Sequence, residues 1–143
     1  MPSTLARHAP ALTQATGFLL VALGVIHLIA TPFLIGWLSR QVHSEDAALA
    51  IAAMRLNFML DGILLISLGV STIWAGRSLG QPWALRLATL SAITLLCLPA
   101  LVVTTMPLES LEAPLFRLAV VVLIFACLVQ LAALVGTWKS RRL

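Results

Sequence analysis

The chain is poor in charged residues, and this scarcity excludes an ordinary water-soluble domain. Only 10% of its 143 residues are Asp, Glu, Lys or Arg, while 61% are hydrophobic. A soluble domain of similar size carries about 25% charged residues. A chain with this few charged residues cannot cover its surface with groups that face water. We therefore expect most of the surface to face lipid. The length fits a single domain, residues 1–143.

Several residue types that carry chemistry are also scarce. The chain has no tyrosine, and its two cysteines, Cys97 and Cys127, lie within apolar runs at no metal-binding spacing. The net charge of +4 comes mainly from basic residues at the ends of apolar runs, which membrane topology explains. We therefore expect no nucleic acid partner, no metal site and no catalytic residues. Hydrolysis is disfavoured because no nucleophile stands at a suitable helical spacing.

Four apolar segments are long enough to cross a membrane, which takes roughly 20 residues. They cover residues 13–38, 50–76, 82–106 and 114–138, and polar segments rich in Gly, Pro or Ser separate them. We predict an all-α integral membrane protein with four transmembrane helices in an up-down bundle. The first segment is longer than the apolar core of a signal peptide and contains His27 and Pro32, so a retained helix is expected.

The distribution of charge predicts the orientation. Four spans place both termini on one side, where the flanking residues are basic and include no acid: Arg7, Arg77, Arg86, Lys139, Arg141 and Arg142. The positive-inside rule then predicts that both termini are cytoplasmic. Trp74, Trp83 and Trp138 would mark the inner boundary of the membrane and Trp37 the outer one.

The size and the four-span layout resemble those of small bacterial membrane families, the DoxX-like proteins among them. The resemblance implies a multi-pass protein of a bacterial-type inner membrane. No residue motif accompanies this layout, so it implies no functional residues.

The sequence also suggests that the chain consists of two similar hairpins. "RLNFMLDG" at residue 55 and "RLAVVVLI" at residue 117 open two of the spans, which close with "WAGR" and "WKSR". In this alignment, Asp61 in the first hairpin corresponds to Leu123 in the second. Only the first hairpin would then keep a polar set within the membrane.

That polar set is the candidate functional site. Asn57 and Asp61 are four residues apart and share one face of a helix. His27 lies on the preceding span at about the same distance from the outer boundary, in a stripe with Gly17, Gly24 and Thr31 whose small residues would let the two helices approach. We therefore expect the imidazole of His27 and the carboxyl of Asp61 to meet in the outer half of the membrane.

The energetics of burial favour a functional role for this set. An ionisable residue near the bilayer centre costs about 2.5–3.5 kcal/mol, and such residues usually mark proton relays, ion paths or ligand sites. Pro32 and Pro99 would free carbonyl groups nearby and help to open a pocket. The predicted ligand- or proton-binding residues are His27, Thr31, Arg55, Asn57, Asp61 and Arg117.

Three functions remain open on the sequence alone. The favoured one is binding or movement of a small solute or proton, by an oligomer or an accessory subunit, because one four-helix chain has little room for a complete pathway. A haem protein is the second; it would use His27 and need a methionine or a partner chain as the other axial ligand. The third is a structural or assembly role, in which the polar residues pack copies together. The cofactor is unknown, and the expected partners are lipid, further copies of the chain or a larger membrane complex.

Overall fold

The computed structural model describes residues 4–40, 47–105 and 114–141, and within these residues it contains four α-helices and no strand. The helices are α1 (Thr4–Leu38), α2 (Ala47–Arg77), α3 (Pro82–Thr105) and α4 (Pro114–Arg141). All four are long and apolar enough to cross a membrane. The predicted all-helical protein with four membrane-length helices is therefore confirmed.

The turn between α2 and α3 shows how the sequence sets a helix boundary. The backbone N–H of Ser78 donates to the carbonyl of Ala75, and that of Gln81 donates to the carbonyl of Ser78. The Gln81 carbonyl then accepts the N–H of Leu85, which opens α3. Pro82 is the first residue of α3, a position where its missing N–H costs no helical hydrogen bond.

Close packing of glycines joins α1 to α2. A Cβ built on Gly17 would lie 2.7 Å from the carbonyl oxygen of Gly69, and one built on Gly24 would lie 2.7 Å from that of Gly62. The two backbones therefore touch at both crossings, which only glycine permits. The seven-residue spacing repeats on both helices and is the period at which antiparallel or parallel helices stay in contact along their length.

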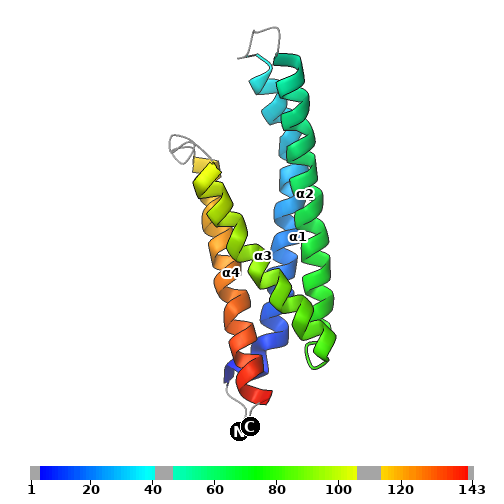
Figure 1. Cartoon of the computed structure of the whole chain (residues 1–143), viewed down its shortest axis with the longest axis vertical. Helices are drawn as coiled ribbons and strands as arrows, with labels where there is room; N and C mark the ends of the chain where they lie inside the picture. The colour runs from blue at the N-terminus through cyan, green and yellow to red at the C-terminus, as the bar shows by residue number, and fades with distance from the viewer. Residues whose placement is uncertain (1–3, 41–46, 106–113, 142–143) are drawn as a thin grey trace.

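The two hairpins, α1–α2 and α3–α4, lean together at one end of the molecule and diverge at the other (Figure 1). The start of α1 and the end of α4 lie at the packed end, where a Cβ on Gly136 would come within 2.9 Å of the Leu5 backbone. We call this the terminal end and the other the open end. Toward the open end α1 and α2 stay side by side, while the α3–α4 hairpin moves away from them (Figure 1).

Small residues allow the helices to cross closely at the terminal end. The buried cluster there consists largely of alanines, which keep the helix backbones near one another: Ala9, Ala75, Leu79, Ala84, Ala88, Ala92, Ala133 and Leu134. Toward the middle of the molecule a second cluster follows, built on Leu20, Leu95, Leu123, Ala126 and Cys127. All four helices contribute to the packing of one or both clusters.

Polar contacts between helices also gather near the terminal end. The hydroxyl of Thr72 on α2 donates to the Leu68 carbonyl (2.7 Å), so it accepts from the hydroxyl of Ser91 on α3 (2.7 Å). The side-chain amide of Gln130 on α4 donates to the Ala88 carbonyl at 3.1 Å. Gln130 therefore bonds between helices α4 and α3.

Candidate functional site

The packing of α1 on α2 sets the relative heights of the predicted site residues. Gly24 lies against Gly62, and the helices run in opposite directions, so His27 is level with Met59. Asn57 and Asp61 are each two residues from that level, which is about 3 Å along the helix axis. His27, Asn57 and Asp61 therefore lie at nearly the same height on the α1–α2 hairpin. We call these three residues the polar layer.

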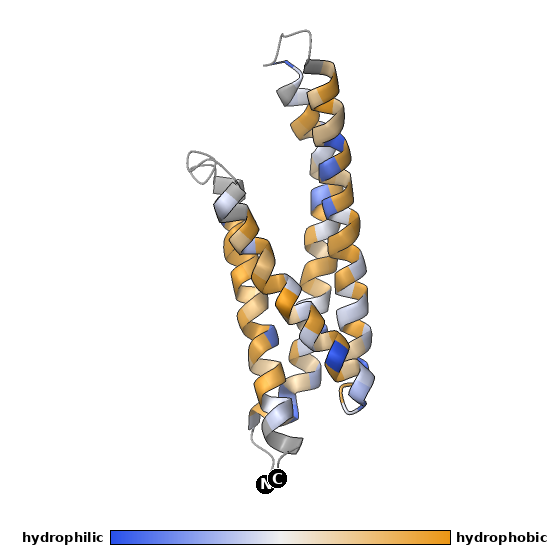
Figure 2. Ribbon diagram, viewed as in Figure 1, coloured by the Kyte–Doolittle hydropathy of each residue, from blue (hydrophilic) through white to orange (hydrophobic). Residues whose placement is uncertain are grey.

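The same layer is set apart by its hydropathy. Figure 2 shows hydrophilic residues within the open half of the α1–α2 hairpin, between apolar stretches on either side. Asp61 is the only acidic residue among those that the structure describes. It is the fourteenth residue of a 30-residue candidate span, Ala48–Arg77, and therefore far from both ends of its helix.

The helical faces show where these side chains are directed. His27 follows Leu20 by seven residues and so shares the face of α1 that is buried in the leucine cluster. Asp61 precedes Leu65 and Leu68 by four and seven residues, and both leucines pack against that cluster. His27 and Asp61 therefore lie on the faces of α1 and α2 that contact α3 and α4 nearer the terminal end. The two residues are farther along those faces, toward the open end.

The α3–α4 hairpin diverges from α1 and α2 toward the open end (Figure 1). Asn57 and Asp61 are exposed, and His27 is half-buried. Within the described part of the chain, no hydrogen bond or ion pair joins His27 to Asp61. The two groups share a height on the α1–α2 hairpin, but they are not in contact in the single chain.

His27 is held by its ring and lacks a polar partner. Its imidazole lies against the ring of Phe58 on α2, with centroids 5.4 Å apart and the planes tilted by 41°. The Nε2 atom is buried and has no hydrogen-bond partner. Buried polar atoms in native proteins are almost always paired, so this ring nitrogen is an exception, as are Thr13 Oγ1 and Gln130 Oε1 among the described residues.

Thr31 makes a hydrogen bond within its own helix. Its side chain is buried, and its hydroxyl donates to the carbonyl of His27 at 2.8 Å. This is the ordinary bond of a threonine to its own helix. Here it lies directly before Pro32, through which α1 continues without a break. Thr31 thus steadies the backbone that carries His27.

The two predicted arginines lie apart from this layer. Arg55 is exposed about a third of a turn away from Asp61 around α2, where it lines a shallow groove of about 360 Å³ with Ile35 and Met59. Arg117 is exposed near the start of α4, on the other hairpin. The two hairpins are separated at that end (Figure 1), so the structure does not bring Arg55 and Arg117 together.

The donor set does not favour a metal or a haem held by one chain. Among the described residues, no group of three or more His, Cys, Asp or Glu side chains could hold a metal ion. Met59 is level with His27 but lines the groove on another face of α2. Met54 lies about 8 Å farther toward the open end, by helical rise. Neither described methionine stands opposite His27, as an axial pair would require.

Some contacts were not anticipated from the sequence. Gly62, Gly69 and Gly76 pack into α1 and so fix the height of Asp61, and their seven-residue spacing was a signal that could have revealed them. The bond between Thr72 and Ser91 carried no such signal, since isolated hydroxyls are common in apolar helices.

No protein-family model, curated protein or solved structure matches the chain.

Proposed function

We propose that the protein binds or moves a small cationic solute or a proton at His27, Asn57 and Asp61. On this proposal the chain is an up-down membrane bundle of a bacterial-type inner membrane, with both termini in the cytoplasm. The polar layer then lies in the outer half of the membrane. The protein acts as an oligomer or as a subunit of a larger membrane complex.

The observation that supports this function most strongly is the exposure of Asp61 in the middle of a membrane-length helix. No ion pair or hydrogen bond to its carboxyl occurs within the described residues. A carboxyl facing lipid at that depth costs about 2.5–3.5 kcal/mol. Placing it there for packing alone gives little in return, because interhelical hydrogen bonds in membranes average about 0.6 kcal/mol.

The functional groups of His27, Asn57 and Asp61 determine which kind of ligand can bind. A carboxylate attracts a cation, and the amide oxygen of Asn57 can accept a hydrogen bond from the same ligand. The unpaired Nε2 of His27 can accept a proton or donate one, depending on its tautomer. Together the three groups suit a protonated amine or a proton that passes between the imidazole and the carboxyl.

Proton movement is the form of this function that can be measured without knowing a ligand. The purified protein would be placed in phosphatidylcholine vesicles that contain a pH-sensitive dye, and an inside-negative potential would be applied. We expect protein-dependent proton entry between pH 5 and 8, and Asp61→Asn should abolish it. In parallel, native mass spectrometry and an absorption spectrum of the purified protein would reveal a co-purified amine or other ligand.

Arg55→Gln is the matched control, because it removes one charge from the same helix on a different face. It should leave the proton flux and any bound ligand unchanged. If the Asp61→Asn protein keeps both the full flux and the same bound species over pH 5–8, the proposed role of the carboxyl is wrong.

A structural role is the second candidate, since the exposure of Asn57 and Asp61 also suits a contact between copies. Substituting His27 and Asp61 together by leucine distinguishes the two functions. A structural role predicts a changed oligomer size by light scattering, with no separate loss of flux or ligand in the copies that still assemble. A binding role predicts loss of flux or ligand at an unchanged oligomer size.

A further inference from the structure

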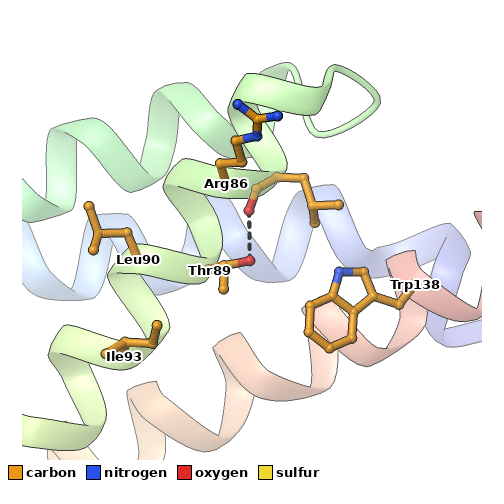
Figure 3. Close-up of a pocket in the computed structure, with 6 residues that line it drawn as sticks. Arg86, Thr89, Leu90, Ile93 and Trp138 are labelled. Atoms are coloured by element: carbon orange, nitrogen blue, oxygen red, sulfur yellow. Dashed lines mark hydrogen bonds between the residues drawn. The ribbon is translucent and has the colours of Figure 1, made fainter.

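A groove of about 390 Å³ runs between α3 and α4 near the terminal end, far from the polar layer (Figure 3). Leu85, Arg86, Thr89, Leu90, Ile93 and Trp138 line it. Trp138 lies across the groove from Thr89, and Arg86 stands at its rim beside the turn that joins α2 to α3 (Figure 3). The groove therefore has a cationic end and an aromatic wall.

Among the described residues, no acidic side chain lies near Arg86. Asp61, the only described acid, is about 24 Å away along the helix axes, given that Thr72 and Ser91 are level. The remaining acids, Glu45, Asp46, Glu109 and Glu112, lie outside the described residues. In the sequence they adjoin the ends of the helices that are remote from Arg86. An anion from outside the chain is the natural partner of this guanidinium.

The rest of the groove is apolar and follows the direction of a lipid chain. Arg86, Leu90 and Ile93 occupy successive turns of α3, so the lining changes from charged to apolar with distance from the terminal end. Tryptophan is enriched at the level of lipid headgroups, and Trp138 is half-exposed there.

We propose that this groove binds an anionic phospholipid. The phosphate group lies at Arg86, and one acyl chain runs along Leu90 and Ile93. Basic grooves between membrane helices are a recognised mode of binding anionic headgroups. The hydroxyl of Thr89 donates to the Leu85 carbonyl at 2.8 Å, so it is not available to donate to the phosphate.

Quenching of Trp138 fluorescence tests the proposal directly. Trp37, Trp74 and Trp83 would be replaced by phenylalanine, and the protein placed in phosphatidylcholine vesicles. Brominated phosphatidylglycerol or brominated phosphatidylcholine would then be added at equal mole fractions. We expect roughly a five-fold preference for the anionic lipid, the effect of about one arginine near an anionic surface. Arg86→Gln should reduce this preference to near one.

Arg77→Gln is the control, since Arg77 is also exposed at the end of a helix but does not line the groove. It should keep the preference. Equal quenching by the two lipids, or equal loss in both variants, would overturn the proposal, as would competition by millimolar inorganic phosphate. If the tryptophan substitutions prevent folding, native mass spectrometry of the unaltered chain and its Arg86→Gln variant, in equal amounts of both lipids, gives the same comparison. The site is supported if the Arg86→Gln variant retains fewer anionic lipids than the Arg77→Gln variant. It is refuted if the two variants retain equal numbers.

Discussion

Replacing Gly17 by alanine tests whether contact between backbones aligns α1 with α2. The new Cβ would lie 2.7 Å from the carbonyl oxygen of Gly69 and 2.7 Å from the backbone nitrogen of Ile73. Real Cβ atoms essentially never approach backbone atoms so closely, and a backbone atom cannot move aside as a flexible side chain can. The helices must therefore separate.

The size of the effect follows from the kind of clash. Forcing an extra methyl group into a closely packed interface costs about 1–3 kcal/mol. This corresponds to a decrease of about 5- to 150-fold in the folding equilibrium constant. Gly36→Ala is the matched control, because nothing lies within 4 Å of a Cβ at that position of the same helix. It should be neutral or stabilise α1 by roughly 0.5–1 kcal/mol.

Both variants would be unfolded in mixed micelles by increasing mole fractions of sodium dodecyl sulfate, with circular dichroism as the signal. We expect a lower midpoint for Gly17→Ala and an equal or higher midpoint for Gly36→Ala. If the two variants unfold at the same midpoint, the glycine contacts do not hold the hairpin, and the shared height of His27 and Asp61 loses its basis.

Three further outcomes follow from contacts within and between the helices. Thr72→Val removes the hydrogen bond to Ser91 and should lower the free energy of unfolding by about 0.6 kcal/mol. Thr89→Val loses only a hydrogen bond within α3 and should change the free energy of unfolding less in the same assay. Gln130→Leu should shift stability by no more than about 1 kcal/mol, because the lost bond to Ala88 is offset by removal of the buried, unpartnered Oε1 atom. A maleimide that partitions into membranes should label exposed Cys97 many-fold faster than buried Cys127, and equal rates by peptide mass spectrometry would contradict the packing of α4.

Hydropathy alone was sufficient to predict the number and positions of the helices. In lipid, a chain must satisfy every backbone polar group within its own segment, so a long apolar run becomes a helix whatever its neighbours are. The predicted spans and the observed helices accordingly overlap throughout, although α1 begins at Thr4 rather than near residue 13.

The divergence of the two hairpins could not be predicted in this way. Faces buried against other helices and faces turned toward lipid are both apolar, so the sequence carries little amphipathic signal to show which face packs. Leu20 and Leu64 are alike as residues, yet Leu20 is almost fully buried and Leu64 is 64% exposed. Periodicity therefore placed Asn57 and Asp61 on one face of α2 without showing that both side chains are exposed.

The predicted hairpin similarity illustrates the same limit. Leu123, the residue aligned with Asp61, is buried in the leucine cluster, while Asp61 is exposed. Equivalent positions in the two hairpins thus have different surroundings, and short matches in apolar sequence did not indicate this difference.

The most direct test of the proposed site is the reaction of Asp61 with a hydrophobic carbodiimide, which modifies carboxyl groups in apolar surroundings. The protein in phosphatidylcholine vesicles would be treated at several pH values, and the adduct located and timed by peptide mass spectrometry. We expect an adduct at Asp61 whose rate of formation changes in His27→Leu but not in Met59→Leu, a substitution at the same height on another face. Equal rates in those two variants, or no adduct at Asp61, would contradict a shared site.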